Sequence, residues 1–241
     1  MLPQDVQYGW AGALAVSTST VLRIALFASI WGGRLFAQTP RDLYLETETA
    51  GGSGKAVHHL GLRYTILLVD PETRSVRAVD PDAPLHEGDC FAIEFVPNHS
   101  GNLYAFNHGS SGAWQLLMPS PQMLNEASSA KVGEARRVPA EHCFRLDNKP
   151  GVERMVLAIT ERPDDIRDLR ELLAKPAGTA PLKVDSAGDL LNSWQRLTGR
   201  DLRLEKIETP GPGERPHSVY AVKSSASESD RLVVEIQIHH E

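Results

Sequence analysis

The sequence has no run of basic residues and no complete catalytic motif. These two absences limit the functions that the protein can have. Its 25 lysine and arginine residues are outnumbered by 31 aspartate and glutamate residues, which gives a formal net charge of -6. A surface that binds nucleic acid needs clustered positive charge. We therefore expect no nucleic-acid partner.

The segments closest to a catalytic motif are all incomplete. Residues 109–112 (Gly-Ser-Ser-Gly) are one residue shorter than a nucleophile elbow, and a β-turn explains them better. Residues 128–131 fit Ser-x-x-Lys but lack its partner motifs, and residues 51–54 lack the Lys-Ser/Thr pair of a phosphate loop. We predict that the protein is not an enzyme and uses no cofactor.

The N-terminus carries the pattern of an export signal. Arg23 precedes an apolar run over residues 24–31, and a small residue, Ala37, offers a cleavage site. We predict that residues 1–37 are a signal peptide, with Val21 as an alternative start, and that the protein is periplasmic or extracellular. The alternative is an uncleaved membrane anchor over residues 10–36, which is long enough to span a bilayer although Arg23 within it would be costly.

Strand patterns dominate the rest of the chain, which has the composition of a globular protein at 41% hydrophobic and 23% charged residues. Within residues 85–119, three alternating segments (89–96, 103–107 and 114–118) are separated by glycine-containing turns, which predicts a three-strand antiparallel meander.

Further strands are predicted on both sides of this meander. They are a hairpin of residues 62–69 and 75–79, a short edge strand at 134–138, a strand at 143–146, a central strand at 153–160 that is apolar on both faces, and strands at 202–207, 218–222 and 232–238. We expect the last two to pair with each other. Apolar residues three and four positions apart predict two short helices, at residues 164–174 and 186–197.

The predicted fold is therefore mainly β: a β-sandwich of antiparallel strands with the two helices inserted before the C-terminal strands. Residues 38–57 are expected to form a flexible segment, with a short strand over 41–48. Residues 58–241 are expected to form one domain, with a core at 62–163 and an extension at 164–241.

The two cysteines, Cys90 and Cys143, are candidates for a disulfide. Each lies on the face of its predicted strand opposite an apolar residue, so both sulfurs would project from the same face if the strands are neighbours. An exported protein meets an oxidising environment, which permits the bond. The alternative is a pair of half-buried free thiols.

Aromatic and histidine side chains supply the remaining site candidates. Tyr64, Tyr104 and Trp114 are a candidate aromatic platform for a sugar or a peptide, with packing in the core as the alternative. The histidine pairs at residues 58–59 and 239–240 could each offer one metal ligand, but two distant single ligands are a weak signal. For His99, His108 and His142, in or beside turns, solvated side chains are the better explanation, and we predict no metal. A hydrolase would need Asp89, His99 and His108 to converge.

Several motifs also occur in an order seen elsewhere. Gly88 and Asp89 open a phenylalanine-rich strand, and residues 100–104 (Ser-Gly-Asn-Leu-Tyr), 109–121 and 150–154 (Pro-Gly-Val-Glu-Arg) follow. This order resembles the bacterial family named domain of unknown function 4384, best over residues 62–163. The resemblance implies a β-sandwich module, in some proteins attached to kinases or caspase-like peptidases, with no shared activity or catalytic residue.

Taken together, these patterns predict an exported, non-enzymatic β-sandwich of the cell envelope that binds another protein. A partner strand could add to the edge strand at residues 134–138. The alternative is a glycan-binding module that uses the aromatic residues. A hydrolase or a metal-binding protein is the least favoured function.

Overall fold

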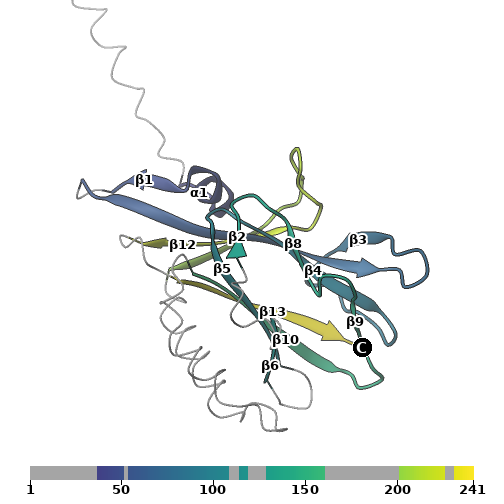
Figure 1. Cartoon of the computed structure of the whole chain (residues 1–241). Coiled ribbons are helices and arrows are strands. Elements are labelled where there is room, and N and C mark those ends of the chain that lie inside the picture. The colour runs from purple at the N-terminus through teal and green to yellow at the C-terminus, as the bar shows by residue number, and fades with distance from the viewer. Residues whose placement is uncertain (1–36, 52–53, 109–113, 119–128, 161–200, 226–230) are drawn as a thin grey trace, which may run out of the picture. The chain divides into compact units, whose positions relative to one another are not determined.

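A computed structural model describes residues 37–51, 54–108, 114–118, 129–160, 201–225 and 231–241. Residues 38–241 form one compact unit. In its described part, this unit contains two antiparallel sheets and one short helix (Figure 1). The predicted mainly-β, sandwich-like fold is confirmed. The helices predicted at 164–174 and 186–197 lie outside the described residues, as do the signal peptide up to residue 36 and the alternative anchor.

The first sheet, sheet A, has eight described strands. Its main path runs β11–β12–β2–β4–β8, while β1 and β3 pair with β2, and β9 pairs with β4. The bounds are β1 Glu48–Ala50, β2 Ala56–Val69, β3 Val76–Val79, β4 Cys90–Pro97, β8 Arg136–Val138, β9 Phe144–Arg145, β11 Leu202–Lys206 and β12 Val219–Ser225.

The second sheet, sheet B, has five described strands. Its order is β13–β10–β5–β6, and β7 also pairs with β5. The bounds are β5 Gly101–His108, β6 Trp114–Met118, β7 Ser129–Ala130, β10 Gly151–Thr160 and β13 Arg231–His240. The strand expected at residues 153–160 is confirmed as central, because β10 lies between β13 and β5. Both of its faces are apolar because one faces sheet A and the other is also buried.

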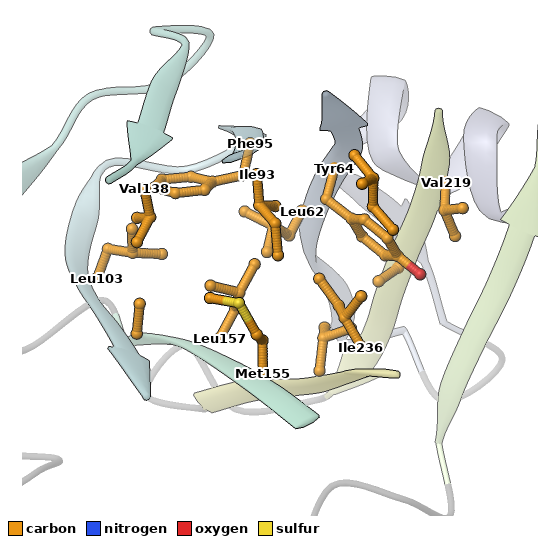
Figure 2. Packing of buried hydrophobic residues seen from close by; sticks show 14 of the residues in the cluster. Leu62, Tyr64, Ile93, Phe95, Leu103, Val138, Met155, Leu157, Val219 and Ile236 are labelled. Carbon is orange, nitrogen blue, oxygen red and sulfur yellow. The ribbon is translucent and has the colours of Figure 1, made fainter. Parts of the chain in front are cut away.

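The core lies between the two sheets. Alternate residues of β2 and β4 in sheet A face alternate residues of β10 and β13 in sheet B, as the period of two in a strand requires. Figure 2 shows Leu62 and Ile93 opposite Met155 and Leu157, all of which are almost fully buried. This shared core joins the sheets into one domain.

The predicted hairpin of residues 62–69 and 75–79 is confirmed, since β2 and β3 pair antiparallel. The predicted meander is wrong. β4 lies in sheet A and β5 in sheet B, so only β5 and β6 form a hairpin from that region. Alternation specifies the buried face of a strand but not its neighbour, and β4 and β5 cover the same core from opposite sides.

The expected pairing of residues 218–222 with 232–238 is also wrong. β12 inserts between β11 and β2 in sheet A, whereas β13 pairs with β10 along its whole length in sheet B. The two strands are close in sequence, but each completes a different sheet. Figure 1 shows β12 and β13 on opposite layers.

The segment at residues 38–57, expected to be flexible with a strand over 41–48, instead contains a helix, α1 (Pro40–Glu46), and then β1. Thr39 caps α1 by accepting a hydrogen bond from the Asp42 N–H, and the Asp42 carboxylate accepts one in return. Pro40 occupies the first helical turn, where a missing N–H costs nothing. Leu43 and Tyr44 then pack on the outer face of sheet A.

Candidate functional site

A groove of about 520 Å³ lies beside β13, where this strand of sheet B faces β2, β11 and β12 of sheet A. Three apolar residues from three strands, Leu204, Val219 and Ile236, contribute to its lining. Val219 and Ile236 are buried, but Leu204 is 54% exposed. The groove therefore combines an apolar floor with an exposed leucine at its margin.

Tyr64 brings a hydroxyl group to this floor. Its ring packs in the core, only 7% exposed, and Figure 2 shows its hydroxyl near Val219 and Ile236. Within the part of the chain that the structure describes, this hydroxyl makes no hydrogen bond. Burial raises the pKa of Tyr64 to about 12, with a smaller contribution from the Asp82 carboxylate. Tyr64 is therefore a neutral hydrogen-bonding group at physiological pH.

The charged side chains around the groove are paired with each other. Lys206 donates to Asp80 Oδ1 at 3.0 Å and to Asp82 Oδ2 at 2.6 Å, and these hydrogen bonds raise the pKa of Lys206. Arg154 binds Glu235 Oε1 through Nε at 2.7 Å and Nη2 at 2.6 Å. Because each cation already has a carboxylate partner, the groove suits an uncharged ligand better than a charged one.

The structure separates the residues of the predicted aromatic platform. Tyr64 faces the core from sheet A, whereas Tyr104 lies in β5 between Leu103 and Ala105, which face the core, so it points to the other face of sheet B. Tyr104 is only 5% exposed. Trp114 lies in β6, and its side chain is outside the described part of the structure. Tyr64 thus belongs to the groove, but it shares no surface with Tyr104.

The residues required for a hydrolase do not converge. Asp89 directly precedes β4 and His99 follows its end, and this eight-residue strand is about 26 Å long. His108 is the last residue of β5, another eight-residue strand that starts beside His99. The Asp89 carboxylate accepts a hydrogen bond from the His86 N–H instead. This set of residues therefore forms no catalytic site.

The histidines near the start of β2 make contacts other than a metal site. Buried His59 forms hydrogen bonds with Thr49 Oγ1 at 2.8 Å and with Ser224 Oγ at 2.9 Å. His58 lies 3.0 Å from Glu48 Oε1. Among the described residues, no three or more His, Cys, Asp or Glu side chains are grouped so that they could hold a metal ion.

Cys90 and Cys143 form a disulfide whose Cα atoms are 5.4 Å apart. Phe144 pairs with Phe91 in the register of β4 and β9, so Cys143 lies diagonally across from Cys90 on the same face. The bond links the start of β4 to the segment leading into β9. It fixes the end of sheet A that lies far from His99.

A buried polar cluster holds α1 and the β11–β12 connection together. The Glu214 carboxylate accepts hydrogen bonds from the Gly211 N–H at 2.6 Å, from Arg41 Nη2 at 2.9 Å and from the Tyr220 hydroxyl. Burial raises the pKa of Glu214, but these hydrogen bonds and the charge of Arg41 outweigh it, so the pKa lies below the usual value. Tyr220 also packs edge-on against Tyr44, with ring centroids 4.8 Å apart.

Sequence reasoning singled out Tyr64 and, as a candidate metal ligand, His239, but not Leu204, Lys206 or Gln237. Leu204 and Lys206 lie on a five-residue edge strand, and Gln237 lies on the polar face of β13. A signal was present in the alternation of β13, which places Glu235, Gln237 and His239 on one face. The contact of Lys206 with Asp80 and Asp82 spans more than 120 residues and has no local signal.

Comparison of the chain with models of protein families, with curated proteins and with solved structures gives no match. In the described residues there is also no helix of the length and apolarity needed to cross a bilayer. The groove and the disulfide are therefore the features of this chain that bear on its function.

Proposed function

We propose that this protein is an exported, non-enzymatic module of the cell envelope that binds another protein through the groove beside β13. The observation that carries the proposal is the exposed Leu204 next to an apolar floor and the Tyr64 hydroxyl. A single exposed leucine is ordinary on a protein surface, but one beside the apolar residues Val219 and Ile236 of a groove gives a partner side chain something to pack against.

Export is supported by two observations. The predicted signal peptide ends near Ala37, and the Cys90–Cys143 disulfide belongs to an oxidising compartment. The motif order that resembles domain of unknown function 4384 also suits a β-sandwich binding module. Cell fractionation followed by N-terminal sequencing tests this part: a mature protein in the periplasm or medium that begins near Gln38 supports it, and a cytoplasmic protein that retains residues 1–37 contradicts it.

Photo-crosslinking tests the binding site. A photoreactive phenylalanine analogue replaces Leu204 in one protein and Val132, which is 61% exposed and does not line the groove, in a control protein. After irradiation in envelope extract, we expect a discrete crosslinked protein from position 204 and none from position 132. Equal crosslinking at both positions, or none, contradicts the proposal. A glycan array probed with the same protein decides whether the groove binds a sugar instead.

A further inference from the structure

The free edge of β13 gives the groove a backbone binding surface in addition to its side chains. β13 pairs with β10 along one edge, and in the described part of the chain no further strand pairs with its other edge. An unpaired strand edge is a template on which another extended chain can form hydrogen bonds. A contact between Leu85 and the end of β13 shows which way the backbone groups of β13 point.

That contact is with Leu85, which forms a parallel bridge to the end of β13. The Leu85 N–H donates to the His239 carbonyl at 2.9 Å, and the Glu241 N–H donates to the Leu85 carbonyl at 2.9 Å. The backbone groups of residues 239 and 241 therefore point away from β10. Since these directions alternate along a strand with continuous register, the N–H and C=O of Gln237 also point away from β10.

Gln237 has no backbone partner in the described residues, although Pro81 and Asp82 of the segment before Leu85 also line the groove. Two residues earlier, the Ala83 N–H donates to the Asp80 carbonyl at 3.0 Å, which closes a turn instead of extending the bridge. Gln237 is exposed and lines the groove. Leu85 thus occupies the last position of a strand-binding edge, and no backbone group of the described residues occupies the next position along it.

We infer that the groove binds an extended peptide segment of a partner protein, which adds as a strand to the free edge of β13 at Gln237. This inference rests on the proposed function and specifies the partner's chemistry. Side chains of an added strand alternate between two faces. One face meets Leu204, Val219 and Ile236, so the segment carries an apolar residue there. The other face meets the paired Arg154 and Glu235, so the segment needs no charge.

The edge of β13 suits this role better than the edge proposed from the sequence. β8 has three residues and is followed by Pro139, and its Arg136 and Arg137 are charged. Short length, charge and proline are the features that protect a sheet edge from pairing. β13 has ten residues, and its outward N–H at Gln237 has no backbone partner in the part of the chain that the structure describes.

Peptide selection provides the test. A library of unconstrained twelve-residue peptides displayed on phage is selected against the whole disulfide-bonded protein, and the strongest binder is synthesised as the probe. Its affinity is measured by calorimetry for the unsubstituted protein, Gln237→Pro and Gln237→Ala. Gln237→Pro removes the outward N–H without affecting the pairing with β10, while Gln237→Ala removes only the side chain. We expect Gln237→Pro to weaken binding at least tenfold and Gln237→Ala less than threefold.

Hydrogen exchange on the unsubstituted protein gives a second readout that does not depend on whether Gln237→Pro folds. The bound probe should slow exchange of the Gln237 and His239 amides and leave those of Ile236 and Ile238, which already pair with β10, unchanged. Unchanged exchange at Gln237, a folded Gln237→Pro protein that binds normally, or failure to select any peptide would overturn strand addition. A crosslinked partner at position 204 would still support the proposed function in those cases.

Discussion

On the side of β2 that pairs with β4, the side chain of Asn98 at the end of β4 supplies the hydrogen-bond partner of the Gly61 N–H. Asn98 Oδ1 accepts a hydrogen bond from the Gly61 N–H at 2.6 Å, and Asn98 Nδ2 donates to the carbonyls of His59 at 2.7 Å and Tyr44 at 3.1 Å. The backbone of Asn98 also donates to the Gly61 carbonyl at 3.1 Å. One buried amide therefore joins α1, β2 and β4 at the point where the chain leaves sheet A.

Substitutions of Asn98 should be destabilising, and at pH 7 Asn98→Asp should destabilise the protein more than Asn98→Ala. Asn98→Ala leaves the Gly61 N–H and the His59 carbonyl without partners, at a cost of about 3 kcal/mol. At pH 7, Asn98→Asp should lower the free energy of unfolding further, because a carboxylate oxygen would then face the two carbonyls. The difference in stability between the two variants should narrow as the carboxyl becomes protonated at lower pH. Urea denaturation measures both variants. An aspartate variant as stable as the unsubstituted protein would contradict these contacts.

Gly61 itself should not tolerate a side chain. A Cβ atom at this position would lie 2.8 Å from Tyr44 Cδ2 and 3.0 Å from Asn98 Nδ2, both in the buried junction. We expect Gly61→Ala to lower the free energy of unfolding by about 1–3 kcal/mol. Gly151→Ala is the matched control, because a Cβ there meets no atom within 4 Å. Equal melting temperatures for the two variants would contradict the close packing at Gly61.

The disulfide should supply a large part of the stability. Its cysteines are separated by 53 residues, and closing a loop of that size in the unfolded chain is worth about 4 kcal/mol in the chain-entropy model. We expect reductant to lower the urea midpoint of the unsubstituted protein and to have no effect on the Cys90→Ala/Cys143→Ala double variant. Alkylation without reductant should label neither cysteine, and labelling of both would contradict the bond.

The Glu214 cluster should make the protein sensitive to acid. Since its pKa is held below the usual value in the folded state, Glu214 contributes stability above the unfolded pKa of about 4.3, and that contribution is lost as the pH falls through the folded pKa. Glu214→Gln should be less stable at pH 7, because it weakens the contact with Arg41, but should approach the unsubstituted protein near pH 3. A constant difference between the two at pH 7 and pH 3 would contradict this role.

His59 should act in a separate pH range. Burial lowers the pKa of His59, so the fold favours its neutral form. The contribution to stability is present above the unfolded pKa of about 6.5 and is lost as the pH falls through the folded pKa. His59→Gln should flatten the fall in stability between pH 7 and pH 5, whereas His86→Gln, at an exposed position, should not. Thermal melts at both pH values measure the effect, and parallel profiles for all three proteins would contradict it.

Local sequence signals predicted the strands better than their partners. The alternation at residues 89–96 and the continuous apolarity at 153–160 gave β4 and β10 their correct places in the chain and, for β10, the central position. Alternation cannot tell whether Asn98 begins a hairpin or a crossing between sheets. That outcome depends on hydrogen bonds from Asn98 to Gly61 and His59, almost forty residues earlier.

The N-terminal helix and the groove show two different reasons for a missed feature. α1 had a local signal in Thr39, Pro40 and Asp42, which form a capping box and a proline first turn, so it could have been read from the sequence. The groove had none of comparable strength. It forms where Tyr64, Leu204 and Gln237 meet, and these residues lie on three strands that only the assembled sheets bring together.

The positions of β12 and β13 determine when during synthesis this protein can fold. β12 pairs with β2 in sheet A, and β13 pairs with β10 in sheet B. Each sheet therefore lacks a strand until residues 219–240 have left the ribosome. The core side chains Leu232, Val234 and Ile236 arrive with the same segment. A nascent chain that ends before them cannot complete its core, so we expect cooperative folding to wait until these last two strands have been made.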